Sequence, residues 1–154
     1  MIDETAAVKT EEWLKEAVAT GARIVLGGGR NGAVLQPTIL TGTTNAMKVE
    51  GLEVFAPVVT LTSVDSFEEA LGKVNDTAFG LQAGVFTNSL DHAFKAYETL
   101  DVGGVVINDY PTYRVDPMPY GGVKESGIGR EGIKYAIEEM MEPRLMVINF
   151  SKRF

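Results

Sequence analysis

Residues 57–108, PVVTLTSVDSFEEALGKVNDTAFGLQAGVFTNSLDHAFKAYETLDVGGVVIN, decide the fold. Short β-prone runs alternate in them with helical stretches, and Ser66 and Ser89 stand where helix N-caps are expected. Because strand–helix–strand alternation gives parallel pairing with helical crossovers, we predict an α/β fold: a parallel βαβαβ sheet with flanking helices. The predicted strands are 57–64, 81–87 and 103–108, and the predicted helices run from Ser66 to about Val74 and from Leu90 to Leu100.

The N-terminal part predicts one helix followed by extended chain. Residues 4–19 carry apolar side chains at helical spacing and end at Gly21, which suits a left-handed residue after a helix. Residues 22–26 form a short apolar run that predicts a strand. Residues 33–40 also look extended, and the proline at position 37 favours an edge strand or a loop-like one.

The C-terminal part predicts a long loop, a helix and a last strand. Prolines and glycines break any period over residues 109–126, and long loops in compact domains are often binding sites. Residues 133–141 have one apolar helical face, and Pro143 ends the helix. Residues 144–150 predict a closing strand.

Length and composition favour one compact globular domain. The chain has 154 residues, 45% of them apolar and 23% charged. A net charge of −7 repels phosphate backbones, so nucleic acid is not an expected partner. No apolar run is long enough to span a bilayer, and the polar start of the chain does not resemble a signal peptide. We therefore expect a cytoplasmic protein without a membrane partner.

The absence of cysteine limits the chemistry of this chain. Without Cys, and with His92 as its one histidine, the chain can form no disulfide, thiolate metal site or histidine cluster, and it has no thiol nucleophile. A Ser89–Asp91–His92 triad is disfavoured because neighbours on one helical turn point in different directions. Ser89 is better explained as a helix cap and His92 as a solvated helix residue.

Two glycine patterns resemble phosphate-binding loops but lack the right surroundings. Gly27, Gly29 and Gly32 follow a strand, yet extended chain comes next where a helix would have to start. The second pattern, at residues 127–132, opens a helix but does not follow a strand. A turn and a loop-to-helix junction are the favoured interpretations.

Two longer segments carry a specific resemblance. Residues 47–58, MKVEGLEVFAPV, and residues 118–132, MPYGGVKESGIGREG, resemble signature motifs of the aldehyde dehydrogenase superfamily, and residues 36–40 (QPTIL) and 79–81 (FGL) match in the same order. The resemblance covers essentially the whole chain. It implies the C-terminal part of a catalytic domain over residues 1–143, followed by a terminal oligomerisation strand and tail over residues 144–154.

The resemblance implies a cofactor contact at Glu53 and Phe55. Glu53 matches a carboxylate that accepts hydrogen bonds from the nicotinamide-side ribose, and Phe55 matches an aromatic that packs by the nicotinamide ring. The alternative makes Glu53 a solvated residue and Phe55 a core residue. Gly51 and Leu52 depart from the family, in which a second acidic residue commonly precedes the cofactor glutamate.

The resemblance places the substrate tunnel at residues 109–116. Its side chains are expected to set aldehyde selectivity, so Asp109, Tyr110 and Arg114 are candidate substrate-binding residues. A guanidinium can fork onto a carboxylate, phosphonate or sulfonate tail. An equally favoured alternative makes Arg114 part of a surface pair with Asp116 or a glutamate.

The family's nucleophilic cysteine and Rossmann domain are expected upstream of Met1. We therefore expect an enzyme segment that is inactive alone, has no catalytic residue of its own and binds no cofactor by itself. In the full-length enzyme, NAD or NADP would serve the oxidation of a small, possibly anionic aldehyde to its acid. The expected partners are that aldehyde, the missing N-terminal part and further copies of the chain. The alternative left open is a non-catalytic interaction or regulatory module with the same fold.

Overall fold

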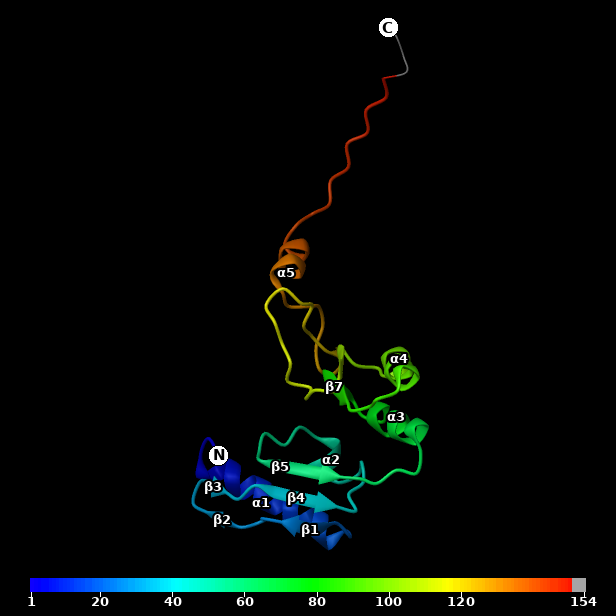
Figure 1. Cartoon of the computed structure of the whole chain (residues 1–154). Coiled ribbons are helices and arrows are strands. Elements are labelled where there is room, and N and C mark those ends of the chain that lie inside the picture. The colour runs from blue at the N-terminus through cyan, green and yellow to red at the C-terminus, as the bar shows by residue number, and fades with distance from the viewer. Residues whose placement is uncertain (151–154) are drawn as a thin grey trace. The chain divides into compact units, whose positions relative to one another are not determined.

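The computed structural model describes residues 1–150 and contains two compact units (Figure 1). These are Met1–Ala78 and Phe79–Phe154, although the length alone favours one domain. The predicted division at residue 143 stays a prediction. Among the described residues, no helix has both the length and the apolar character that crossing a bilayer requires.

The first unit begins with α1 (Glu4–Ala19), which confirms the predicted N-terminal helix. The carboxylate of Asp3 caps it by accepting a hydrogen bond of 2.7 Å from the amide of Ala6. Ala7, Leu14 and Ala17 lie buried on one face of the helix. After the helix, Gly21 has a φ of +116°, a value that glycine adopts without strain.

A three-stranded mixed sheet forms the centre of this unit. The middle strand is antiparallel to one neighbour and parallel to the other. Its Leu40 is fully buried, so the prediction of an edge strand is wrong here. Pro37 lies just before the strand and removes no donor from its ladder, which is why a central position is allowed. In spatial order the strands are β1 (Arg23–Leu26), β4 (Thr38–Thr41) and β5 (Val58–Leu61).

A short hairpin, β2 (Arg30–Asn31) with β3 (Val34–Leu35), is tied to α1 through Arg30. Its guanidinium lies 3.2 Å from carboxylate oxygens of both Glu11 and Glu4. The hydrogen bond from Arg30, with a smaller contribution from Lys15, holds the pKa of Glu11 below its ordinary value. The ion pairs therefore join the hairpin to the helix.

Two further helices complete the first unit. The four-residue α2 (Lys48–Gly51) lies beside α1, and α3 (Phe67–Asn75) follows β5. The hydroxyl of Ser66 accepts a 3.1 Å hydrogen bond from the amide of Glu69, which confirms the predicted cap. The Glu69 carboxylate accepts a 2.9 Å bond from the amide of Asp65, one residue before the cap.

The main core of the described chain lies entirely in this unit. It joins one face of α1 to the sheet and to the start of α2, so these elements hold one another in place. Trp13 packs against its border. The buried members of this core are Leu14, Ala17, Ala22, Leu35, Leu40, Met47 and Val49.

The second unit contains a parallel strand pair with a helical crossover. β7 (Gln82–Val85) and β8 (Gly104–Ile107) run parallel, and α4 (Leu90–Thr99) connects them. The Ser89 hydroxyl accepts a 3.3 Å hydrogen bond from the amide of His92, which confirms its role as a cap. This βαβ unit has the connection predicted from its sequence.

The described strands do not form the single parallel sheet that the alternation predicts. After α3 the chain forms β6 (Phe79–Gly80), which pairs antiparallel with β9 (Val123–Lys124). β5 belongs to the first sheet and β7 to a separate pair. Sequence alternation indicates the type of each element, but it does not decide which strands become neighbours.

The C-terminal region is apolar and exposed in this chain. No side chain of α5 (Ile133–Glu139) is buried. Residues 144–150 form no strand in the described chain. The oligomerisation strand stays a prediction, and residues 151–154 of that segment lie outside the described residues. The exposed apolar side chains of the segment are Leu145, Met146, Val147, Ile148 and Phe150.

Candidate functional site

The predicted cofactor residues lie on an irregular segment, residues 52–57, between α2 and β5. Glu53 is exposed, so its carboxylate oxygens are accessible to a hydrogen-bond donor. Phe55 is 80% exposed and has a φ of +51°, which is an uncommon conformation for a side chain of that size. The alternative of Phe55 as a core residue does not hold in this chain. Exposed, strained residues of this kind are frequent at ligand sites.

The predicted substrate residues lie on the loop after β8. The Asp109 carboxylate accepts a 2.8 Å hydrogen bond from the amide of Tyr110, and the Tyr110 ring meets Phe86 edge-on at 5.7 Å. The loop begins at Asn108, whose φ is +59° and whose side-chain oxygen accepts a 2.8 Å bond from the amide of Thr87. These contacts fix the start of the loop against the end of β7.

Arg114 contacts Glu131 and Tyr120, two residues that were not predicted from the sequence as its partners. Its Nη2 lies 2.7 Å from Oε2 of Glu131, and its guanidinium stacks 4.4 Å from the ring centroid of Tyr120. The Glu131 contact is the surface pair named above as an alternative. Nearly half of the Arg114 side chain remains exposed, so some of its five N–H donors can reach a ligand.

Backbone pairing explains why Glu131 is available to Arg114. The amide and carbonyl of Tyr120 bond to the carbonyl and amide of Glu131, at 3.1 and 2.6 Å. This bridge brings together two residues eleven positions apart in the signature segment. The sequence did contain a hint of this pair: Arg114 lies just before the signature segment, which contains both Tyr120 and Glu131.

The first glycine pattern cannot serve as a phosphate loop in this conformation. The amide of Gly28 donates to the Thr38 hydroxyl at 3.0 Å, and that of Gly29 donates to the Gln36 side-chain oxygen at 3.2 Å. These amides are thus already used within the chain, and the hairpin that follows confirms a turn. In the second pattern, Gly132 opens only the seven-residue α5.

The candidate residues form two groups, one in each compact unit. Glu53 and Phe55 belong to the first unit, whereas Asp109, Tyr110 and Arg114 belong to the second. Within residues 1–150, no cluster of three His, Asp or Glu side chains could hold a metal ion.

Comparison with known proteins assigns the family. The model of the aldehyde dehydrogenase family matches residues 1–146. The chain belongs to this family. It is 55% identical over 149 residues to the 3-sulfolactaldehyde dehydrogenase of Priestia aryabhattai and 41% identical over 149 residues to a lactaldehyde dehydrogenase of Methanococcus maripaludis. Each alignment covers 97% of this chain but only 31% and 32% of those relatives, so the chain spans about a third of their length.

Solved aldehyde dehydrogenases have the same fold. Aldehyde dehydrogenase 21 from Physcomitrella patens, in complex with the reaction product succinate, is 45% identical with a TM-score of 0.94; the match covers 100% of this chain and 32% of that one. Glyceraldehyde-3-phosphate dehydrogenase from Methanocaldococcus jannaschii, complexed with NADP, is 41% identical with a TM-score of 0.85; that match covers 91% and 30%.

The residues present fit one end of the family's dinucleotide cofactor. The exposed carboxylate of Glu53 suits ribose hydroxyls, and the exposed ring of Phe55 suits the flat face of a nicotinamide. The amides of Gly28 and Gly29 are already bonded within the chain, so that loop does not fit a pyrophosphate. The fit is therefore limited to the nicotinamide side.

Proposed function

We propose that this chain is the C-terminal part of an NAD(P)-dependent aldehyde dehydrogenase that oxidises a small anionic aldehyde to its carboxylic acid. The observation that carries the substrate class is the half-exposed guanidinium of Arg114 on the loop after β8. The relatives with assigned activities are dehydrogenases, which favours an enzyme segment over the non-catalytic module. The names or titles of three relatives give a compound with an anionic group: 3-sulfolactaldehyde, succinate and glyceraldehyde 3-phosphate.

On the cofactor side, Glu53 would accept hydrogen bonds from the ribose hydroxyls and Phe55 would pack beside the nicotinamide. When bound, NAD(P) supplies the acceptor for the hydride that leaves the aldehyde. The thiol nucleophile must come from outside this chain, which contains no cysteine. The role of these two residues is thus to orient the cofactor.

On the substrate side, Arg114 would bind the anionic tail and leave the aldehyde carbon free to react. Glu131 and Tyr120 hold the guanidinium in place, which lowers the entropy lost when it binds an anion. Asp109 and Tyr110 would shape the remaining wall of the substrate tunnel. Arginine suits this role because its planar fork matches carboxylate, phosphate and sulfonate oxygens.

Association with other chains belongs to the same proposal. The exposed apolar residues of segment 144–150 would pair as a strand with a neighbouring subunit, and the rest of the enzyme would supply the cysteine and the remaining cofactor contacts. The support is the exposure of these side chains, four of them at 79% or more, which is unfavourable in water. A paired strand from a neighbouring subunit would cover these side chains.

The substrate proposal can be tested with two aldehydes that differ in one charged group. In the full-length enzyme that contains this chain, Arg114→Ala should raise the KM for 3-sulfolactaldehyde about tenfold or more, because a charge-assisted contact is lost. The KM for lactaldehyde, which lacks the sulfonate, should change less than about twofold. Steady-state kinetics with both substrates measure the difference.

Two further variants serve as controls. Arg114→Lys keeps the charge but loses the fork, so it should recover part of the affinity for the sulfonate. Lys134→Ala removes another exposed cation close to an aromatic ring, that of Tyr135, and should change neither KM. Equal effects of Arg114→Ala on both aldehydes would make Arg114 a structural residue and contradict the anionic substrate.

A further inference from the structure

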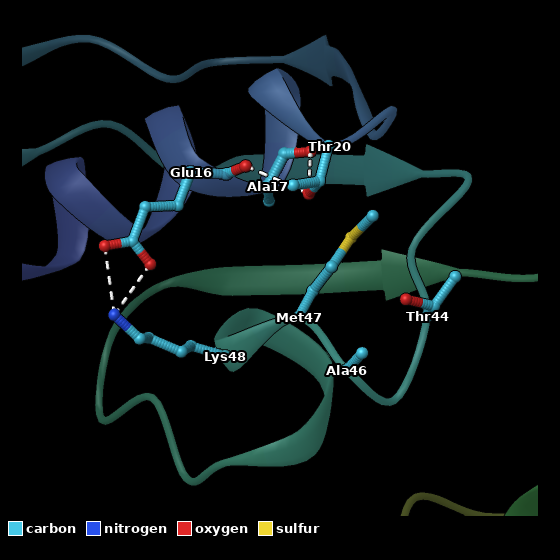
Figure 2. A pocket seen from close by; sticks show the side chains of 7 residues that line it. All are labelled: Glu16, Ala17, Thr20, Thr44, Ala46, Met47 and Lys48. Atoms are coloured by element: carbon cyan, nitrogen blue, oxygen red, sulfur yellow. Dashed lines mark hydrogen bonds and ion pairs between the residues drawn. The ribbon is translucent and has the colours of Figure 1, made fainter.

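The turn that precedes Glu53 is clamped to α1. Lys48, at the start of α2, places its amino group 2.9 and 2.7 Å from the two carboxylate oxygens of Glu16. Figure 2 shows this pair beside a pocket, with the Met47 side chain pointing toward α1. Met47 is one of the buried core residues, so the first turn of α2 is held by packing as well as by charge.

The loop before α2 is clamped separately to the end of α3. The side-chain amide of Asn45 donates hydrogen bonds to the backbone carbonyl of Asp76 at 2.8 Å and to its carboxylate at 2.6 Å. Asp76 is the C-cap residue of α3. These two bonds tie the Asn45 side chain to the end of α3.

Gly51 closes α2 against this clamped loop. A Cβ atom at position 51 would lie 2.4 Å from the Asn45 carbonyl oxygen, which is a backbone atom and cannot rotate away. Glycine is therefore required at position 51 because the backbone of Asn45 comes so close, and not because the backbone of Gly51 is left-handed.

Glu53 lies two residues beyond this contact, on a segment anchored at both ends. At the α2 end, the amides of Gly51 and Leu52 bond to the carbonyls of Met47 and Lys48 at 2.9 and 3.1 Å. At the other end, the carbonyl of Pro57 accepts a 2.9 Å bond from the amide of Thr38. A shift at Gly51 is therefore passed on to Glu53, because the β5 end cannot follow it.

We propose that Asn45 and Gly51 are positioning residues that fix where the Glu53 carboxylate meets the nicotinamide-side ribose of NAD(P). The proposal rests on the cofactor role proposed for Glu53. It makes the Asn45–Gly51 contact a determinant of cofactor affinity, although neither residue touches the cofactor. The predicted substrate residues belong to the other compact unit.

The test uses the full-length enzyme that contains this chain and compares two glycines. Gly51→Ala should raise the KM for NAD(P) about fivefold to tenfold, while kcat and the KM for the aldehyde change less than about twofold. Gly72→Ala is the matched control, because Gly72 lies in α3 and a Cβ there would meet nothing within 4 Å. It should leave all three constants unchanged.

Asn45→Ala provides a second variant that adds no bulk. It removes both bonds to Asp76 and should raise the KM for NAD(P) in the same direction. A purely structural role would instead lower the thermal midpoint and the active fraction, and hence kcat, without changing that KM. If both variants leave the KM for NAD(P) unchanged, or raise both KM values equally, the positioning proposal is wrong.

Glu53→Gln separates this inference from the function on which it rests. If Glu53→Gln raises the KM for NAD(P) but neither Gly51→Ala nor Asn45→Ala does, the positioning proposal fails and the cofactor role of Glu53 survives. If Glu53→Gln has no effect on that KM, the cofactor role fails and the positioning proposal fails with it. If Gly51→Ala does not fold, Asn45→Ala decides.

Discussion

Single side chains in this protein are held by partners from distant parts of the chain. Arg114 was a candidate from its place in the loop, and a surface pair with a glutamate was one of two alternatives for it. Which glutamate could not be predicted, because Glu131 comes within 2.7 Å of Arg114 only through the backbone bridge with Tyr120. Long-range pairs of this kind depend on the folded backbone and leave no local pattern in the sequence.

Glu53 and Phe55 show that a sequence motif can locate residues without predicting their exposure or their backbone conformation. The motif located both residues, but nothing in it predicted that the Phe55 ring would be 80% exposed at a φ of +51°. Exposure depends on what packs above the segment, and that is a property of the whole fold. The roles of both residues remain proposals that the kinetic tests address.

The Arg30–Glu11 pair makes the stability of the first unit depend on pH. The pKa of Glu11 lies below its ordinary value of 4.5, chiefly because of the hydrogen bond from Arg30. A lowered carboxyl pKa stabilises the fold above the unfolded pKa, and this stabilisation is lost as the pH falls through the folded value. Arg30→Gln should therefore lower the thermal midpoint at about pH 7 and have a smaller effect at about pH 3.

The midpoint can be followed by fluorescence of Trp13, the one tryptophan of the chain, which lies in the same unit. Lys73→Gln is the control, because its 3.7 Å pair with Glu69 is roughly half exposed on α3 and should contribute little at either pH. An effect of Arg30→Gln that is equally large at both pH values would contradict the electrostatic explanation.

At the scale of elements, the helices were predicted well and the sheet less well. α1 and the capped starts of α3 and α4 follow from local signals, because a cap and a 3.6-residue period are written in adjacent residues. The order of the strands is not local. β4 is central because β5 pairs with it from twenty residues further along the chain.

Residues 144–150 show the same limit at a chain end. Their composition is that of a strand, but a strand also needs a neighbouring strand, and in the described chain these residues are not assigned to any sheet. The sequence can therefore predict the tendency to form a strand without predicting the strand itself.

The cap of α3 can be tested by substitution. Ser66→Ala removes the acceptor for the Glu69 amide and should destabilise the first unit by about 1 kcal/mol. Ser66→Asp keeps an acceptor and adds a charge that suits a helix N-terminus, so it should remain close to the original. Urea unfolding followed by Trp13 fluorescence measures both. No loss of stability in Ser66→Ala would mean that α3 melts independently of the core.

On the scale of the whole molecule, the two compact units differ in their packing and in the candidate residues that they carry. The main core lies in Met1–Ala78, whereas the second unit carries the predicted substrate loop and the exposed apolar segment. The chain spans about a third of the length of the relatives that it matches, so the activity of a whole enzyme is a proposal for it. The roles proposed for its residues are to orient the cofactor and the substrate.

The central claim is that this chain serves NAD(P)-dependent aldehyde oxidation only as part of a larger enzyme. The most direct test is the initial rate of NAD(P)H formation from 3-sulfolactaldehyde, measured for the pure 154-residue chain and for the full-length enzyme that contains it. We predict NAD(P)H formation by the full-length enzyme and none above a heat-inactivated control by the isolated chain, because a thiol nucleophile is required. NAD(P)H formation by the isolated chain, or none by the full-length enzyme, would contradict the claim.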